Sequence, residues 1–111
     1  MQRFKMTVKV DSGISYAIHD YCDKCGISVW KFLSASITER LREPLNSSIA
    51  EIDRKRSHEY GTDVSFYFGI SDTITLEKLK IIREDYGISL NYFFAKTIAE
   101  KLEELGYTLA N

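Results

Sequence analysis

Hydrophobic and polar residues alternate along two short stretches of the chain, and each stretch predicts a β-strand. The apolar positions are Phe4, Met6, Val8 and Val10 in the first stretch and Val64, Phe66, Phe68 and Ile70 in the second. A period of two directs these side chains to one face and the intervening ones to the other. We therefore expect strands over residues 4–10 and 64–70, whose outward residues are Lys5, Thr7 and Lys9 and then Ser65, Tyr67 and Gly69.

After each strand the apolar spacing changes to three and four residues, which is typical of an amphipathic helix. The stripes are Ile14, Ala17, Ile18, Tyr21, Cys22 and Cys25 in the first copy and Leu76, Leu79, Ile82 and Tyr86 in the second. The segments Asp11-Ser12 and Ser71-Asp72-Thr73 supply N-cap candidates. Gly26 and Gly87 stand where a C-cap glycine belongs, because glycine takes the left-handed conformation at little cost.

A second helix is predicted after each of these glycines. Ser28 and Ser89 are the N-cap residues. We expect the first of these helices to end near Glu43, since Pro44 blocks its continuation. The other should run to about Leu105, with Gly106 as its stop.

The two strand-helix-helix segments are copies of one pattern. Cys25-Gly26-Ile27-Ser28-Val29 is echoed by Tyr86-Gly87-Ile88-Ser89-Leu90, 61 residues later. The strands align at an offset of 60, so the second copy has one extra residue at the start of its first helix. We place the copies at residues 4–43 and 64–105 of a single compact domain, 1–111. One copy is too small to bury a core, so their strands should pair antiparallel while their helices interlock.

Residues 44–63 connect the copies and are too long for a simple turn. Ser48-Ile49-Ala50-Glu51 reads as a capping box and Gly61 as a stop, which predicts a short helix over residues 49–59. The triplet Arg54-Lys55-Arg56 could contact phosphate, but a solvated polar face is the favoured interpretation. His58 is expected on the surface of this linker.

Composition adds limits to this mostly α-helical picture. The chain has 111 residues with one proline, and no run is long enough for a membrane span or a signal peptide. We therefore expect an intracellular protein. The net charge of −1 does not by itself suggest nucleic acid, yet residues 1–10 carry Arg3, Lys5 and Lys9 and no acid.

With strand, helix, Gly-Ile-Ser and helix in register twice, each copy resembles a ribbon-helix-helix (MetJ/Arc-type) DNA-binding module. The resemblance covers about residues 4–42 and 64–104. The tandem single-chain form resembles the conjugative-plasmid regulator TraY and the transcription regulators of archaeal viruses. It implies two motifs in one chain that form an intramolecular pseudo-dimer around a two-stranded antiparallel ribbon. It also implies a cytoplasmic location, in a prokaryotic cell or a virus-infected host cell.

The resemblance further implies that the ribbon enters the major groove of duplex DNA and that its outward side chains read bases. The readers carried over are Lys5, Thr7, Lys9, Ser65 and Tyr67. Lysine can donate to guanine O6 and N7, and threonine offers a hydroxyl and a methyl group. Because Ser65, Tyr67 and Gly69 depart from the usual polar or charged readers, we expect the first copy to dominate base readout.

In the family that the chain resembles, the N-terminus of the second helix meets the DNA backbone, where amides and the helix dipole attract phosphate. The phosphate contacts so implied are Arg3, Ser28, Val29, Lys31, Ser89, Leu90 and Asn91. Both serines can also serve simply as N-caps, and the two roles are compatible.

Other constellations favour structural roles. His19, Cys22 and Cys25 could present soft ligands from one helix, but both cysteines lie on the apolar stripe and no second cysteine pair completes a zinc site. We therefore expect core cysteines and no metal. Trp30 and Tyr92 could contact the linker, another copy or DNA; packing is the favoured role.

No phosphate loop or activated nucleophile indicates an enzyme, a cofactor or a small-molecule substrate. The sequence thus predicts a sequence-specific double-stranded DNA-binding transcriptional regulator, with room for higher-order assembly along DNA. The alternative is a protein-interaction or nucleoprotein accessory module on the same scaffold, whose DNA affinity would be incidental. The neutral second strand and the slightly acidic net charge keep this alternative open.

Overall fold

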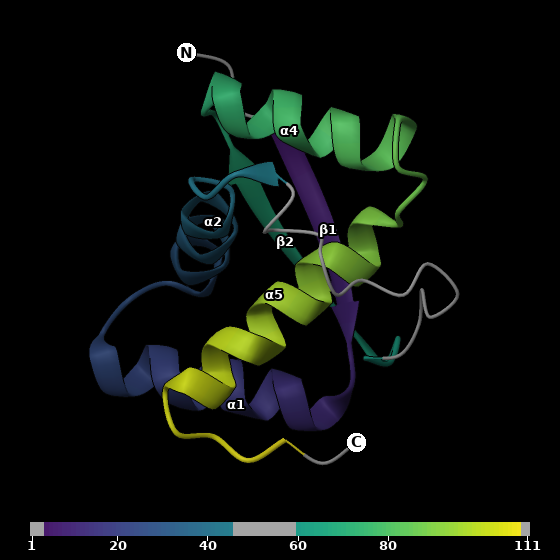
Figure 1. Ribbon diagram of the computed structural model, residues 1–111. Coiled ribbons are helices and arrows are strands. Elements are labelled where there is room, and N and C mark those ends of the chain that lie inside the picture. The colour runs from purple at the N-terminus through teal and green to yellow at the C-terminus, as the bar shows by residue number, and fades with distance from the viewer. Residues whose placement is uncertain (1–3, 46–59, 110–111) are drawn as a thin grey trace.

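The two alternating stretches form a two-stranded antiparallel sheet, and a pair of helices follows each strand. The computed structural model describes residues 4–45 and 60–109. Within them the order is β1 (Phe4–Val10), α1 (Ser12–Cys25), α2 (Val29–Arg40), β2 (Val64–Ile70), α4 (Thr73–Glu84) and α5 (Leu90–Glu104) (Figure 1). The mostly helical fold class and the antiparallel pairing are confirmed. The helix expected over residues 49–59 lies outside the described residues.

The register of the sheet explains which strand positions are buried. Phe4 lies opposite Ile70, Thr7 opposite Tyr67, and Val10 opposite Val64. The predicted apolar phase faces inward, with Val8, Val10, Phe66, Phe68 and Ile70 buried and Met6 and Val64 partly buried. Gly69, predicted on the outward side of its strand, is buried. Phe4 departs in the opposite direction, since 49% of its surface is exposed. It is the first residue of the ribbon, where fewer neighbours surround a side chain.

Side-chain caps start each of the four helices in the described residues, as the sequence predicts. The carboxylate of Asp11 accepts a hydrogen bond from the Ile14 amide at 2.8 Å, and that of Asp72 accepts one from the Thr75 amide at 3.0 Å. The Thr75 hydroxyl also donates to Asp72, and these bonds hold the pKa of the Asp72 carboxyl below its usual range. The extra residue of the second copy is Ser71, which separates β2 from the Asp72 cap.

The Gly-Ile-Ser turns are built alike in the two copies. Gly26 and Gly87 have φ values of 68° and 65°, in the left-handed region, so the chain reverses cheaply after each first helix. The hydroxyls of Ser28 and Ser89 then accept hydrogen bonds from the amides of Lys31 and Tyr92 at 3.3 and 3.4 Å. Ile88 is buried beside this turn and Ile27 is half-buried, which fixes each turn to the core.

The ends of the second helices differ from each other. α2 ends at Arg40, earlier than the expected Glu43, because the amides of Arg42 and Glu43 turn to tighter hydrogen bonds. The ammonium of Lys78 on α4 donates to the carbonyls of Leu41 and Glu43 and so satisfies this frayed end. α5 ends at Glu104, close to the prediction, and Gly106 follows with a φ of 100°.

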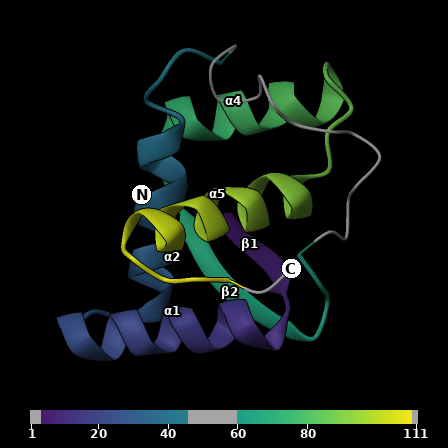
Figure 2. The ribbon, with the colours of Figure 1, turned by 60° about the horizontal axis from the view of Figure 1, so that its bottom comes forward.

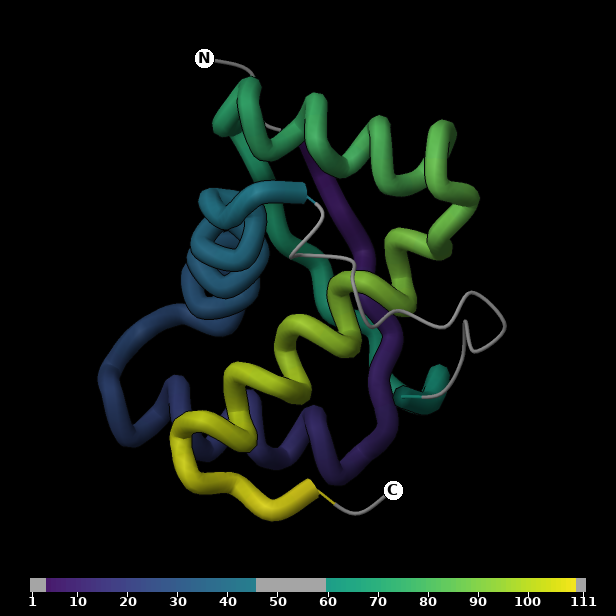
Figure 3. Tube along the Cα trace, in the orientation of Figure 1, coloured from purple at the N-terminus to yellow at the C-terminus, as the bar shows by residue number. Residues whose placement is uncertain are grey.

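The two strand-helix-helix units interlock around one core. α2 packs against β2, α5 packs against β1, and the two helices pack against each other, so each second helix covers the strand of the other unit. Both views of the ribbon show α2 and α5 on one side of the sheet, with α1 and α4 at its two ends (Figures 1 and 2). The tube in Figure 3 follows the same order of elements in both units: β1 leads into α1 and α2, and β2 leads into α4 and α5. Neither unit therefore has a core of its own.

Candidate nucleic-acid interface

The outer face of the ribbon brings together all five predicted base-contacting residues. Lys5, Thr7 and Lys9 on β1 and Ser65 and Tyr67 on β2 are exposed, with 69% of the Tyr67 surface open to solvent. We call these five residues the reading face. They are exposed together because each strand directs its alternate, apolar residues towards α2 and α5.

The register distributes charge along the reading face in a way that the sequence alone does not reveal. Lys5 lies opposite Gly69 at one end, Lys9 opposite Ser65 at the other, and Thr7 opposite Tyr67 in the middle. Four residues separate the lysines, which corresponds to about 13 Å along an extended strand. Both ends of the ribbon thus carry one cation beside a small neighbour. Both lysines of the reading face lie on β1 and none lies on β2, but each end of the ribbon carries one lysine.

The helix N-termini expected to meet phosphate differ in their side chains. On α2, Ser28 and Lys31 are exposed and Val29 is half-buried. On α5, Ser89 and Leu90 are half-buried, and the counterpart of Lys31 is Tyr92, which is buried and lies 5.8 Å from the Tyr60 ring. The first amides of both helices have no acceptor within the helix. A phosphate at α2 would have an ammonium nearby, whereas at α5 it would rely on backbone amides.

Asn91 makes a contact that the sequence did not predict. Its Oδ1 accepts a hydrogen bond from the backbone amide of Lys9 at 2.7 Å, and its Nδ2 donates to the Lys9 carbonyl at 3.5 Å. The side chain predicted to touch phosphate is therefore engaged with the edge of β1. A signal existed at the sequence level: the repeat aligns Asn91 with Trp30, two residues of different hydrogen-bonding capacity.

Three further sequence predictions concern residues whose structure is not described. Arg3, expected to contact phosphate, the triplet Arg54-Lys55-Arg56 and His58, expected on the linker surface, all lie outside the described residues. Trp30 is described and is 41% exposed near the start of α2, so the packing role expected for it applies to only part of its surface.

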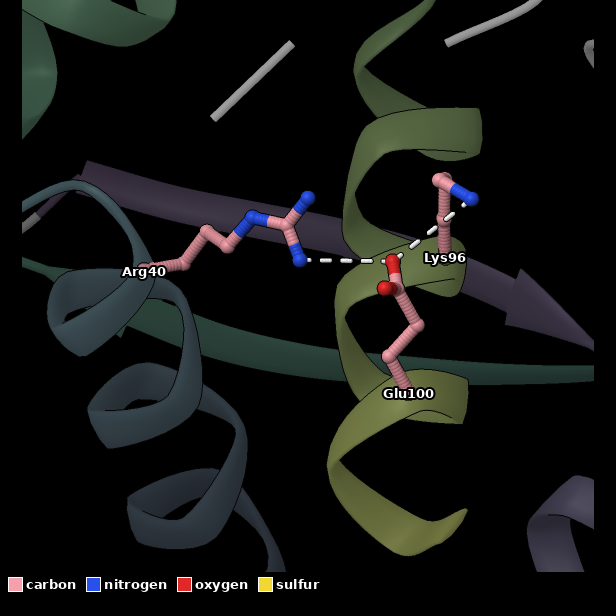
Figure 4. A network of polar contacts seen from close by, with 3 residues as sticks. All are labelled: Arg40, Lys96 and Glu100. Carbon is pink, nitrogen blue, oxygen red and sulfur yellow. Dashed lines mark hydrogen bonds and ion pairs between the residues drawn. The ribbon is translucent and has the colours of Figure 1, made fainter. Parts of the chain in front are cut away.

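On the side of α2 and α5 away from the ribbon, ion pairs join the two helices reciprocally. Arg40 lies 3.3 Å from Glu100, and Lys101 lies 3.6 Å from Glu39. The repeat offset of 61 exchanges one pair for the other. Glu100 also forms an ion pair with Lys96 at 3.6 Å. Figure 4 shows these residues, with both strands passing behind them. Partly exposed pairs contribute little energy each, but their reciprocity shows that the helices cross in a pseudo-symmetric way.

The same side carries a groove of about 540 Å³ between the C-terminal halves of α2 and α5. Its charged lining is mainly acidic, comprising Glu39, Glu43, Glu100, Glu103 and Glu104 with Arg40 and Lys101. Negative charge thus collects behind the ribbon, while the reading face carries two lysines and no acid. This separation lets a chain with a net charge of −1 present a basic surface.

One prediction for the cysteines is wrong. Cys22 is buried, as expected, and burial raises the pKa of its thiol. Cys25 is exposed instead of lying in the core, because it is the last residue of α1 and the chain turns away at Gly26. His19 is exposed and its ring lies 5.5 Å from that of Phe66. Across residues 4–45 and 60–109, no three His, Cys, Asp or Glu side chains are grouped to hold a metal ion.

Comparison with known proteins gives no match. The chain matches no protein-family model, no curated protein and no solved structure. Among the described helices, none combines the length and the apolar character needed to cross a membrane.

Proposed function

We propose that this chain is a tandem ribbon-helix-helix protein, an intramolecular pseudo-dimer that binds specific sequences of double-stranded DNA and regulates transcription. The observation that carries the proposal is the reading face, five exposed polar and aromatic residues on the outer side of a ribbon whose inner side is buried. The exchanged packing of α2 on β2 and α5 on β1 supports the pseudo-dimer, as do the reciprocal pairs Arg40–Glu100 and Lys101–Glu39.

The dimensions and chemistry of the ribbon suit the major groove. That groove is about 12 Å wide and admits a two-stranded β-ribbon. Lys5 and Lys9 would donate to guanine O6 and N7 at the two ends of the contact, and Thr7 would offer its hydroxyl and methyl groups between them. Tyr67, opposite Thr7, would pack against base edges near the centre of the site.

Phosphate contacts would flank this readout. The N-termini of α2, at Ser28 and Val29, and of α5, at Ser89 and Leu90, would present amides and the positive end of each helix dipole. Lys31 would add one charge on the α2 side. These contacts would set the position of the ribbon on the duplex, while the reading face would set the sequence. A cytoplasmic site of action, in a prokaryotic or virus-infected cell, is part of the proposal, and no catalytic step belongs to it.

A selection of bound sequences from random duplex DNA tests this function. The purified protein should enrich one sequence, and the double variant Lys5→Ala, Lys9→Ala should lose about 1–3 kcal/mol of binding free energy per lysine at that sequence. The slope of log affinity against log salt should also become shallower. The matched control is Lys96→Ala, Lys101→Ala, which removes the same charge from the far side of α5 and should leave binding near wild type.

One observation favours a second candidate, a protein-interaction or nucleoprotein accessory module. Tyr67 is a large aromatic side chain at the centre of the exposed face and is 69% exposed, and such residues are common at protein interfaces. The same selection separates the two. A module of this kind would enrich no sequence, and loss of Lys5 and Lys9 would leave both its weak DNA affinity and the salt dependence of that affinity unchanged.

A further inference from the structure

The two lysines of the ribbon, Lys5 and Lys9, differ in the hydrogen bonds that side chains make to their backbones. β1 pairs on one side with β2, so the amides and carbonyls of its other side form an open strand edge. At Lys9 this edge is occupied, since Asn91 accepts from the Lys9 amide at 2.7 Å and donates to its carbonyl at 3.5 Å. Among the hydrogen bonds of the described residues, no side chain makes such a contact with the backbone of Lys5.

A primary amide is well suited to this contact. It carries one carbonyl acceptor and an NH₂ donor, the same pair of groups that a neighbouring strand would present. Asn91 therefore substitutes for a third strand at a single position. Because Asn91 lies in the first turn of α5, and Phe93 and Phe94 bury the next turn in the core, the Lys9 backbone is tied to a rigid element.

The repeat shows that this arrangement belongs to one half only. The counterpart of Asn91 is Trp30, and the counterpart of Lys9 is Gly69. An indole has one N–H donor and no acceptor, so it cannot form the same two bonds to a strand edge. Gly69 in turn has no side chain that a fixed backbone could aim. Each end of the ribbon thus carries one lysine, but only the backbone of Lys9 is held by Asn91.

We propose that Asn91 is a positioning residue that fixes the strand backbone under Lys9, and that the end of the ribbon at Lys9 therefore discriminates bases more strictly than the end at Lys5. A lysine on a fixed backbone samples fewer positions, so it cannot follow a displaced acceptor when the base pair is wrong. This inference rests on the proposed DNA-binding function and specifies its target, an operator whose two half-sites are read with unequal stringency.

The test measures discrimination separately in each half-site. For wild type, a base-pair change under Lys9 should weaken binding more than a change under Lys5. Asn91→Ala should reduce the discrimination ratio at the Lys9 half about tenfold, a loss of the order that one base contact contributes. Affinity for random duplex DNA and discrimination at the Lys5 half should stay within about twofold of wild type, because that half keeps its own contacts.

A double-mutant cycle shows whether Asn91 acts through Lys9. In a Lys9→Ala background, Asn91→Ala should have no further effect on base discrimination. A readout without DNA accompanies it: hydrogen exchange at the Lys9 amide should accelerate in Asn91→Ala, while amides of the buried Val8 and Val10 keep their protection. Asn91→Gln, which keeps the amide on a longer stem, should restore part of both effects.

The outcomes separate this inference from the function on which it rests. If wild type selects no sequence at all, the proposed function fails and the inference fails with it. If wild type selects a sequence and Asn91→Ala leaves both half-sites unchanged, or weakens both equally, the positioning role alone is wrong. An undiminished effect of Asn91→Ala in the Lys9→Ala background would also overturn it.

Discussion

Interlocking of the two units predicts that a core mutation in either unit destabilises the whole chain. Ile37 on α2 and Ile98 on α5 are equivalent under the repeat, and both are 0% exposed. Replacing either by alanine removes three buried carbons, worth roughly 2.4 kcal/mol in transfer free energy. The cavity left behind raises the loss to about 3 kcal/mol. We therefore expect Ile37→Ala and Ile98→Ala to lower the unfolding free energy by similar amounts.

The assay uses probes that report on different parts of the molecule. Trp30 is the only tryptophan and lies in the first unit, whereas far-ultraviolet circular dichroism follows all helices. In urea, Ile98→Ala should shift the Trp30 fluorescence transition and the dichroism transition to the same lower midpoint, with an unchanged m-value. The melting temperature should fall by about 10–20 °C. Ile74→Ala is the matched control, since Ile74 is 67% exposed and should change stability by less than about 0.5 kcal/mol.

Separate unfolding transitions for the two probes would contradict this prediction. If Ile98→Ala moved the dichroism midpoint and left the Trp30 transition in place, the first unit would fold independently of the second. The exchanged packing of α2 on β2 and α5 on β1 would then not control stability.

Three further predictions follow from local contacts. Ser28→Ala and Ser89→Ala should each lower the free energy of unfolding by about 1 kcal/mol, because each removes an N-cap of equivalent geometry. Denaturant unfolding measures both losses, and very different values would contradict the equivalence of the two caps. The Tyr107 hydroxyl donates a hydrogen bond to Asp20 at 2.6 Å, which raises the pKa of Tyr107 to about 12 and, together with Lys24, lowers the pKa of Asp20. This contact therefore stabilises the fold from above the ordinary range of an aspartate pKa to about pH 10, and the stabilisation is lost as the pH rises towards 12 or falls through the Asp20 pKa. Tyr107→Phe should remove the alkaline dependence together with one phenolate transition near pH 12 in absorbance titration, and it should weaken the acid dependence, part of which the Lys24 ion pair at 2.9 Å maintains. A thiol reagent should modify exposed Cys25 quickly and buried Cys22 only at the rate of unfolding, and equal rates would contradict the burial of α1.

Local sequence signals predicted the elements well. The period-two alternation located both strands, and the caps Asp11, Asp72, Ser28 and Ser89 located the helix starts, because caps and alternation depend on neighbours along the chain. The exposure of Cys25 could not be predicted from the apolar periodicity of α1, because that periodicity does not show how far along the helix the core extends.

The relations between the units were harder to predict. The partner of each strand position, and hence the placing of one lysine at each end of the ribbon, depends on the antiparallel register. The hydrogen bonds between Asn91 and the Lys9 backbone join residues 82 positions apart and depend on how α5 packs against β1. The residues of the reciprocal ion pairs can be recognised in the sequence, because Glu39-Arg40 and Glu100-Lys101 repeat at the offset of 61. Their pairing could not be predicted, because it depends on how α2 and α5 cross.

Chemical footprinting on a selected operator tests most directly whether the reading face enters the major groove. Dimethyl sulfate methylates guanine N7 in the major groove and adenine N3 in the minor groove, so one reagent reports on both. We predict protection of guanine N7 at the two ends of the site, lost in the double variant Lys5→Ala, Lys9→Ala, with adenine N3 still reactive. Protection of adenine N3, or guanine protection that survives the loss of both lysines, would contradict it.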